Sequence, residues 1–345
     1  MKASSSAHPA ADPAERVRTL VLAEGQRWRQ RHPILQHQDA LGVAWLLFAW
    51  AGVILSAWGY VIGAWSAWVT VPMVAFFASI THELEHDLIH WMYFRKRPWA
   101  HHLMMACVWL ARPSTINPWI RRHLHFQHHK ASGTAEDYEE RAITNGERWG
   151  WLRLWMTADN VMAVVLRVPR APTWKLRRRM MWRAALGYFP LGWINWGLWY
   201  LFLAYHLGHA VGLSWAQSWS AAAEWVDTLV VIWIGPNVLR TFCLHFVSSN
   251  MHYFGDVEPG NVVQQTQVLN PWWMWPLQLF CCNFGSTHAI HHFVVKEPFY
   301  IRQLTAPVAH RAMREAGVRF NDFGTFKRAN RWSADAGWGS SPSNV

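Results

Sequence analysis

The feature that most constrains this chain is a pair of long stretches without Asp, Glu, Lys or Arg. The first lies between Asp39 and Glu83, and the second runs from Ala184 to Ala223. A helix needs about 20 apolar residues to cross a bilayer, so each stretch can supply spanning helices. We predict four spans, near 41–59, 63–81, 186–205 and 222–242. Pro236 is expected to kink the last one.

The composition agrees with a membrane protein. Hydrophobic residues make up 52% of the chain and charged residues only 15%, against about 25% in soluble domains. The chain contains 27 tryptophans, a residue that favours membrane interfaces and broad apolar cavities. The formal net charge of +11 could indicate nucleic-acid binding, but no nucleic-acid-binding motif is present.

The basic residues also predict an orientation. The connections at 59–63 and 206–221 contain no Lys or Arg, and the positive-inside rule therefore places the other polar regions in the cytoplasm. We expect a cytoplasmic arm at 1–40, a membrane domain at 41–305 and a cytoplasmic tail at 306–345. The predicted location is a bacterial inner membrane.

Three groups of histidines follow the apolar stretches, with spacings of mostly three or four residues. Residues at these spacings share one face of a helix, and imidazole suits iron, copper, zinc and nickel. His206 and His209 fall on the opposite side of the predicted membrane and are not expected to be ligands. The candidate ligands are His82 and His86 in THELEHDLIH, with His90 as a further candidate, His125, His128 and His129 in HLHFQHH, and His288, His291 and His292 in HAIHH.

Other functions can be weighed against this pattern. HELEH fits the HExxH motif of zinc proteases with Glu83 as base, but such an enzyme would leave the other two groups unexplained. A metal transporter would predict ionisable residues near the middle of the bilayer, whereas these histidines follow the cytoplasmic ends of the spans. The four cysteines form no CxxC pair and are expected to be reduced packing residues.

The three groups and the hydrophobic plan resemble the membrane fatty acid desaturase and hydroxylase superfamily. The resemblance implies an all-α integral membrane protein with about four transmembrane helices and a cytoplasmic helical cap that holds a histidine-rich di-metal site. It implies two non-haem irons and the use of O2 and two electrons to attack an unactivated C–H bond. In acyl-CoA desaturases of this superfamily a further ligand comes from a segment similar to MHYFGD, which marks His252 as a ninth ligand. Ser248 stands where those enzymes have Asn, and Asn250 is the nearest substitute.

The resemblance implies desaturation of a fatty acid or fatty-acyl chain. Relatives with the same histidine boxes include acyl hydroxylases, carotenoid hydroxylases and ketolases, and decarboxylases that form terminal alkenes, and the sequence does not separate these reactions. No haem, flavin or iron–sulfur motif is visible, so we expect an external electron donor such as ferredoxin with its reductase. An acidic carrier of this kind would dock on the basic cytoplasmic face.

Metal-bound histidines usually donate their second ring N–H to an acceptor. Six carboxylates lie near the histidine groups in sequence, and we expect about two of them to serve in this way. They are Glu83, Glu85, Asp87, Glu136, Asp137 and Asp256. His123 and His245 flank the motifs and are expected to pack or to form hydrogen bonds.

Overall fold

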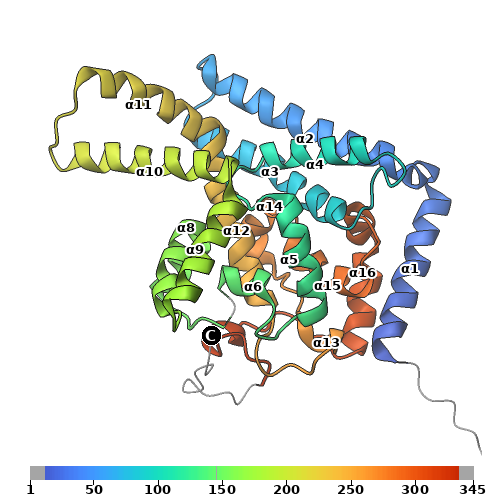
Figure 1. Ribbon diagram of the computed structural model, residues 1–345. Coiled ribbons are helices and arrows are strands. Elements are labelled where there is room, and N and C mark those ends of the chain that lie inside the picture. The colour runs from blue at the N-terminus through green and yellow to red at the C-terminus, as the bar shows by residue number, and fades with distance from the viewer. Residues whose placement is uncertain (1–11, 145, 334–345) are drawn as a thin grey trace, which may run out of the picture.

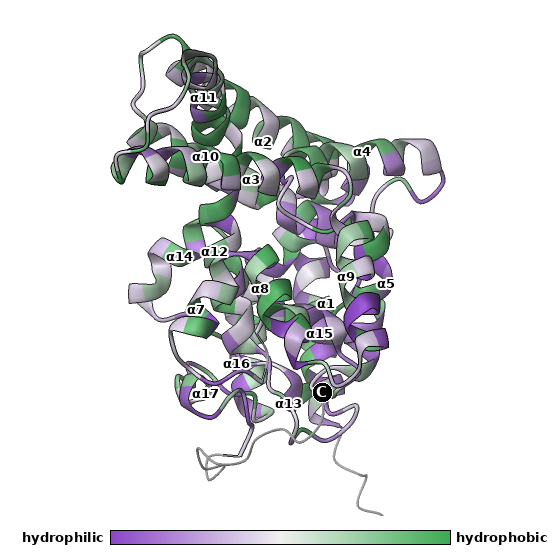
Figure 2. Ribbon diagram, turned by 60° about the vertical axis from the view of Figure 1, so that its left-hand side comes forward, coloured by the Kyte–Doolittle hydropathy of each residue, from purple (hydrophilic) through white to green (hydrophobic). Residues whose placement is uncertain are grey.

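A computed structural model describes residues 12–144 and 146–333 of this chain, and its regular elements are helices. Figure 1 shows an upper tier of long helices above a lower tier of shorter ones. Figure 2 shows that hydrophobic residues gather in the upper tier. The upper tier consists of α2 (Gln38–Val61), α3 (Ala67–Ile89), α4 (Pro98–Leu110), α10 (Leu191–Ala210) and α11 (Gln217–Leu229).

The lower tier contains most of the remaining elements. These are α1 (Pro13–Arg31), α5 (Pro118–Ala131), α6 (Tyr138–Ile143), α7 (Trp151–Ala158), α8 (Asn160–Arg167), α9 (Trp174–Tyr188), α13 (Val262–Gln265), α14 (Trp275–Leu279), α15 (Phe284–Phe293), α16 (Phe299–Glu315) and α17 (Gly324–Lys327). The 3₁₀ turns are Pro33–Gln36, Val168–Arg170 and Trp272–Met274. Helix α12 (Gly235–Met251) joins the two tiers.

Helices α2 and α3 form the predicted hairpin. A Cβ atom on Gly52 would lie 2.2 Å from the ring of Phe77, so the absence of a side chain lets the two helices approach closely. The other faces carry large apolar side chains that the protein does not cover, such as Leu47 and Trp68, the latter 90% exposed. An uncovered apolar surface of this kind is typical of contact with lipid.

Three segments are long and apolar enough to cross a membrane: Gln38–Val61, Ala67–Ile89 and Trp219–Met251. The last is helical throughout, with a π-turn at Val230–Ile234 in which the N–H of Gly235 donates to the carbonyl of Val230. This turn directly precedes Pro236, which lacks an N–H, and Figure 1 shows the chain changing direction between α11 and α12. The protein is therefore an all-α integral membrane protein with an irregularity at the predicted position.

The predicted third span differs from the helix that forms. The range 186–205 begins inside α9 and crosses Phe189–Pro190, whereas α10 starts only at Leu191. Helix α10 is not among the three candidate spans, because polar residues such as Asn195 and His206 lower its hydropathy. It lies beside α11 in the upper tier (Figure 1), and a count of four spans stays a prediction.

Helix α1 is packed into the lower tier. Val17 and Val21 are fully buried in a core shared with α12, α15 and α16. Arg29 forms an ion pair of 2.6 Å with Glu297, beyond the end of α15. The described part of the predicted N-terminal arm is thus packed against α15, which carries the third histidine group, and against α12 and α16. The predicted domain boundary at residue 305 falls inside α16.

Candidate metal centre

The helices bring eight histidines together in two groups of four. One group contains His86, His90, His125 and His291, and the other contains His128, His252, His288 and His292. Within each group, one ring nitrogen from each histidine lies within 4.8 Å of those from the other three. Such convergence of imidazoles from separate segments is the arrangement that a metal ion requires.

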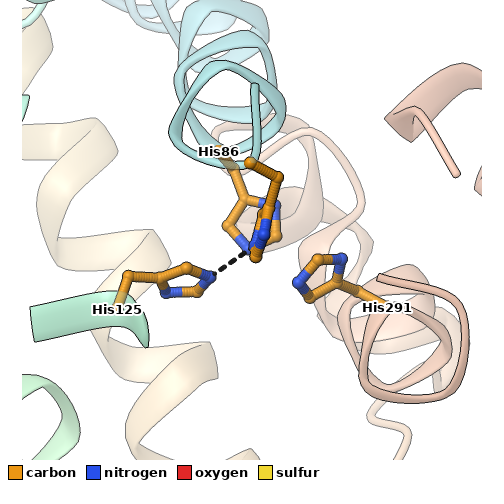
Figure 3. Close-up of side chains that lie close together, drawn as sticks. His86, His125 and His291 are labelled. Carbon is orange, nitrogen blue, oxygen red and sulfur yellow. Dashed lines mark hydrogen bonds between the residues drawn. The ribbon is translucent and has the colours of Figure 1, made fainter. Parts of the chain in front are cut away.

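Four segments supply these side chains. The C-terminal end of α3 carries His86 and His90, α5 carries the HLHFQHH group, α15 carries the HAIHH group, and His252 follows α12. Figure 3 shows His86, His125 and His291 pointing toward one another from three helices. An isolated β-bridge to Thr266 holds His252 beyond the helix end.

His129 lies beside the first group. Its Nε2 is 3.1 Å from Nε2 of His125 and 3.0 Å from Nε2 of His291. With this side chain, nine histidines lie in or beside the two groups. The nine ligands predicted from the sequence include His82 in place of His90.

The difference concerns His82 and His90. The structure brings His90 into the first group, with its Nε2 3.0 Å from Nε2 of His125. It brings His82 into neither group. The Nδ1 of His82 instead lies 3.3 Å from Nη1 of Arg112, because His82 is one helical turn further toward the apolar end of α3.

Carboxylates on α6 and its N-cap face the histidine groups. Nδ1 of His125 donates to Glu139 at 2.8 Å, and Nδ1 of His128 donates to Asp137 at 2.9 Å. His252 Nδ1 lies 3.1 Å from Glu140 and 3.0 Å from the carbonyl oxygen of Ser248. With the proton held on Nδ1, the Nε2 lone pair is available to a metal.

Asp137 was among the carboxylates predicted for this role, whereas Glu139 and Glu140 were not. The available signal was the acidic run that follows HLHFQHH, since a helix starting there places several acidic residues beside the preceding helix. Gln265, which lies 3.2 Å from Nδ1 of His292, had no signal in the sequence.

The predicted carboxylates on α3 pair with arginines instead. Arg302 on α16 lies 3.0 Å from both Glu83 and Asp87. Glu85 pairs with Arg112 and, at 2.8 Å, with Arg121. All of these side chains except Arg121 are almost fully buried, so the ion pairs fix α3 against its neighbours and neutralise charge beside the histidines.

The other predicted polar residues lie away from both groups. Asp256 accepts hydrogen bonds from the backbone N–H groups of Trp332 and Ser333, and Glu136 bonds Thr134. Asn250 accepts from Arg153 and donates to the carbonyl of Phe246.

The geometry fits metal ions. Nε2 atoms of neighbouring histidines are 3.0 to 3.3 Å apart, and two imidazoles bound at about 2.0–2.1 Å and a right angle would be roughly 3 Å apart. Both ring nitrogens of His86 and the Nε2 of His128 are buried without a hydrogen-bond partner among the described residues. Buried polar atoms normally have a partner, and bound metals would provide one.

Comparison with known proteins agrees with this site. The family profile described as "Fatty acid desaturase" matches residues 63–324, which include all three histidine groups and His252. The chain belongs to the fatty acid desaturase family. Searches of curated proteins and of solved structures gave no match. Membership supports an oxidoreductase of the membrane desaturase and hydroxylase type.

Electrostatics in this desaturase-family site keep most of the histidines neutral. Burial lowers the pKa of five histidines of the two groups and their neighbour, namely His125, His129, His288, His291 and His292. His128 differs: burial opposes its protonation, but the nearby carboxylates of Asp137, Glu140 and Glu139 raise its pKa to about 9. A metal at His128 would therefore replace the proton on Nε2 while Nδ1 keeps its proton.

A cavity of about 90 Å³ reaches the histidines of both groups. Its apolar lining includes Ile116, Leu124, Ile143, Leu244 and Phe284, and its polar lining includes His82, His86, His128, Arg121 and His245. Pockets that enclose a whole small ligand measure about 300–1,000 Å³, so this one accommodates only a short segment of a chain. A desaturase-family substrate would present one part of its length here.

Proposed function

We propose that the protein is an O2-dependent di-iron oxidoreductase that attacks an unactivated C–H bond of a fatty acid or fatty-acyl chain, with desaturation as its reaction. The observation that carries the proposal is the cavity that opens between two groups of buried histidines. In desaturation, two hydrogens from the substrate and two electrons with two protons from a donor reduce O2 to two waters. Two bound irons would supply the oxidant that no side chain can supply.

The ligand set we propose is nine histidines: His86, His90, His125, His128, His129, His252, His288, His291 and His292. Their own partners have defined tasks. Glu139, Asp137 and Glu140 hold protons on Nδ1 and so keep each Nε2 directed at the metal positions. Leu124, Leu244 and Phe284 give the cavity an apolar wall, which excludes water from the reacting carbons.

Electrons and substrate would arrive from different sides. We propose that the lower tier faces the cytoplasm, since the Lys and Arg residues lie outside the two connections that contain none. A soluble carrier such as ferredoxin with its reductase would dock on that face. The substrate, an acyl chain in the membrane lipid phase, would enter along the apolar helices.

The experiment combines metal analysis with product analysis. Protein purified in detergent should contain close to two irons per chain and little zinc, and cells that express it should oxidise fatty acids in an O2-dependent way. His252→Ala should lower both iron content and product, because it removes one of the converging imidazoles. The control is His206→Ala, since His206 lies on α10 and bonds Asp227. One zinc and no iron would refute the proposal.

A further inference from the structure

His82 is buried in a way that fixes its proton. Its side chain is 2% exposed, and Nη1 of Arg112 lies 3.3 Å from its Nδ1. A guanidinium can only donate hydrogen bonds, so Nδ1 must be the acceptor and the proton must lie on Nε2. Arg112 is itself held by Glu85. The neutral tautomer of His82 is therefore the one that cannot bind a metal through Nε2.

The Nε2–H group of His82 lacks an acceptor. It is buried, and no residue that the structure describes accepts a hydrogen bond from it. His82 lines the same cavity as His86, His288 and Arg121. A buried donor without a partner is unfavourable, and an oxygen atom of a ligand in this cavity would satisfy it.

The surroundings of this donor carry positive charge. The guanidiniums of Arg112, Arg121 and Arg240 are close enough to act electrostatically on His82. Arg240 is fully buried and bonds two neutral side chains, those of Asn237 and Thr241, and its Nη1 has no partner among the described residues.

The carboxylates of this region are already paired. Glu85 pairs with Arg112 and Arg121, and Glu139 pairs with Arg121 and His125. Glu83 and Asp87, on the neighbouring face of α3, pair with Arg302. Glu140, which lines the same cavity, pairs with His252. Arg240 has no carboxylate partner among the residues that the structure describes, so its guanidinium favours an anionic oxygen near His82.

We propose that His82 is a positioning residue that binds the carboxylate of a free fatty acid, an inference that rests on the proposed function. His82 lies four residues before His86 on the same face of α3, which corresponds to about 6 Å along the helix. A chain held by its carboxylate at His82 therefore presents the carbons next to that carboxylate to the metal positions. The substrate class is the free acid, and oxidation occurs near its carboxyl end rather than in the middle of the chain.

The test uses two substitutions in the full-length, iron-loaded protein. His82→Leu removes the donor, and His82→Gln keeps an acceptor for Arg112 and a donor toward the cavity. Both should retain wild-type iron, unlike His86→Leu. His82→Leu should raise KM for a free fatty acid about 10- to 100-fold, the range for losing a hydrogen bond to a charged group, with a smaller change in kcat. His82→Gln should recover most of the loss.

Product analysis gives a second readout that does not depend on the variants. A fatty acid deuterated only beside the carboxyl group should lose deuterium during turnover by the wild-type protein, whereas one deuterated in the middle of the chain should not. Loss of mid-chain deuterium, or iron loss in His82→Leu and His82→Gln equal to that in His86→Leu, would overturn the inference. Iron-loaded protein that oxidises the middle of the chain leaves the proposed function intact, whereas the absence of any O2-dependent product refutes both.

Discussion

Glu139 offers the most direct test of how the protein prepares its histidines for metal. One carboxylate oxygen accepts from Nδ1 of His125 at 2.8 Å, and the other accepts from Nε of Arg121 at 2.9 Å. Burial favours the neutral acid, but His125 and Arg121 hold the pKa of Glu139 well below its usual range. Both oxygens are therefore acceptors at neutral pH.

Glu139→Gln keeps the shape of the side chain but replaces one acceptor with a donor. If the amide NH2 faces His125, the Nδ1 of His125 must become the acceptor and its proton moves to Nε2. That Nε2 lies 3.0 Å from Nε2 of His90, and once protonated it could no longer bind metal. If the amide NH2 faces Arg121, two donors meet and a charge-assisted hydrogen bond is lost. Arg121 keeps Glu85 as a partner, but its full charge still favours the amide oxygen, so we expect the first orientation to prevail.

The expected magnitude follows from this change of tautomer. Removing the partner of a metal-bound histidine typically costs 10- to 100-fold in metal affinity or activity, which corresponds to about 1.4–2.7 kcal/mol. Burial lowers the pKa of His125, so proton competition at this ring is weak near neutral pH and does not offset the loss.

Iron retention against a graded series of chelator concentrations measures the effect. Glu139→Gln should release iron at 10- to 100-fold lower chelator concentration than the wild type. Glu136→Gln is the matched control, since Glu136 lies on the same acidic run but bonds Thr134, and it should stay within about twofold, as expected for a surface substitution. Equal retention in Glu139→Gln and wild type would refute the assigned role, and so would an equal shift in the control.

Two further predictions concern stability and topology. Arg302→Met should lower the free energy of unfolding in detergent by about 3–5 kcal/mol, because it leaves Glu83 and Asp87 buried without their partner. The control Arg16→Met breaks the exposed pair with Glu315 and should cost at most about 1 kcal/mol. Similar losses in the two variants would contradict a stabilising role for the buried pairs of Arg302. Cysteines introduced at Val61 and Ser214 should react with a membrane-impermeant reagent on the non-cytoplasmic side, whereas one introduced at Glu315 should react only after permeabilisation, and the reverse pattern would overturn the proposed orientation.

The sequence predicts the helical hairpin well because its signal is local. The absence of charge between Asp39 and Glu83 indicates two apolar helices, and the structure places them at Gln38–Val61 and Ala67–Ile89. The third predicted span was less accurate, because uncharged residues continue across Phe189–Pro190, where one helix ends and the next begins. The absence of charge identifies an apolar stretch but does not locate a break within it.

Partners of the histidines were harder to predict, since they depend on how separate helices meet. Proximity in sequence suggested the α3 carboxylates, yet Glu83 and Asp87 point toward Arg302 on α16. The acidic residues of α6 reach His125, His128 and His252 because α6 packs against both α5 and α12. No pattern within a single segment contains that information.

The choice between His82 and His90 shows the same limit most clearly. Both lie four residues from His86 on one face of α3, so spacing treats them alike. What separates them is the register of the helices opposite. Arg121 lies four residues before His125 on α5, and Phe284 lies four residues before His288 on α15. The ring centroids of Phe284 and His82 are 5.7 Å apart.

At the other end of that face, the ring centroid of His90 lies 4.9 Å from the ring centroid of His125 and 5.1 Å from that of His129. The histidines of α5 therefore meet α3 at His90 and not at His82. The turn that carries His82 meets an arginine and an aromatic ring, which agrees with the positioning role that we propose for His82 rather than with a metal ligand.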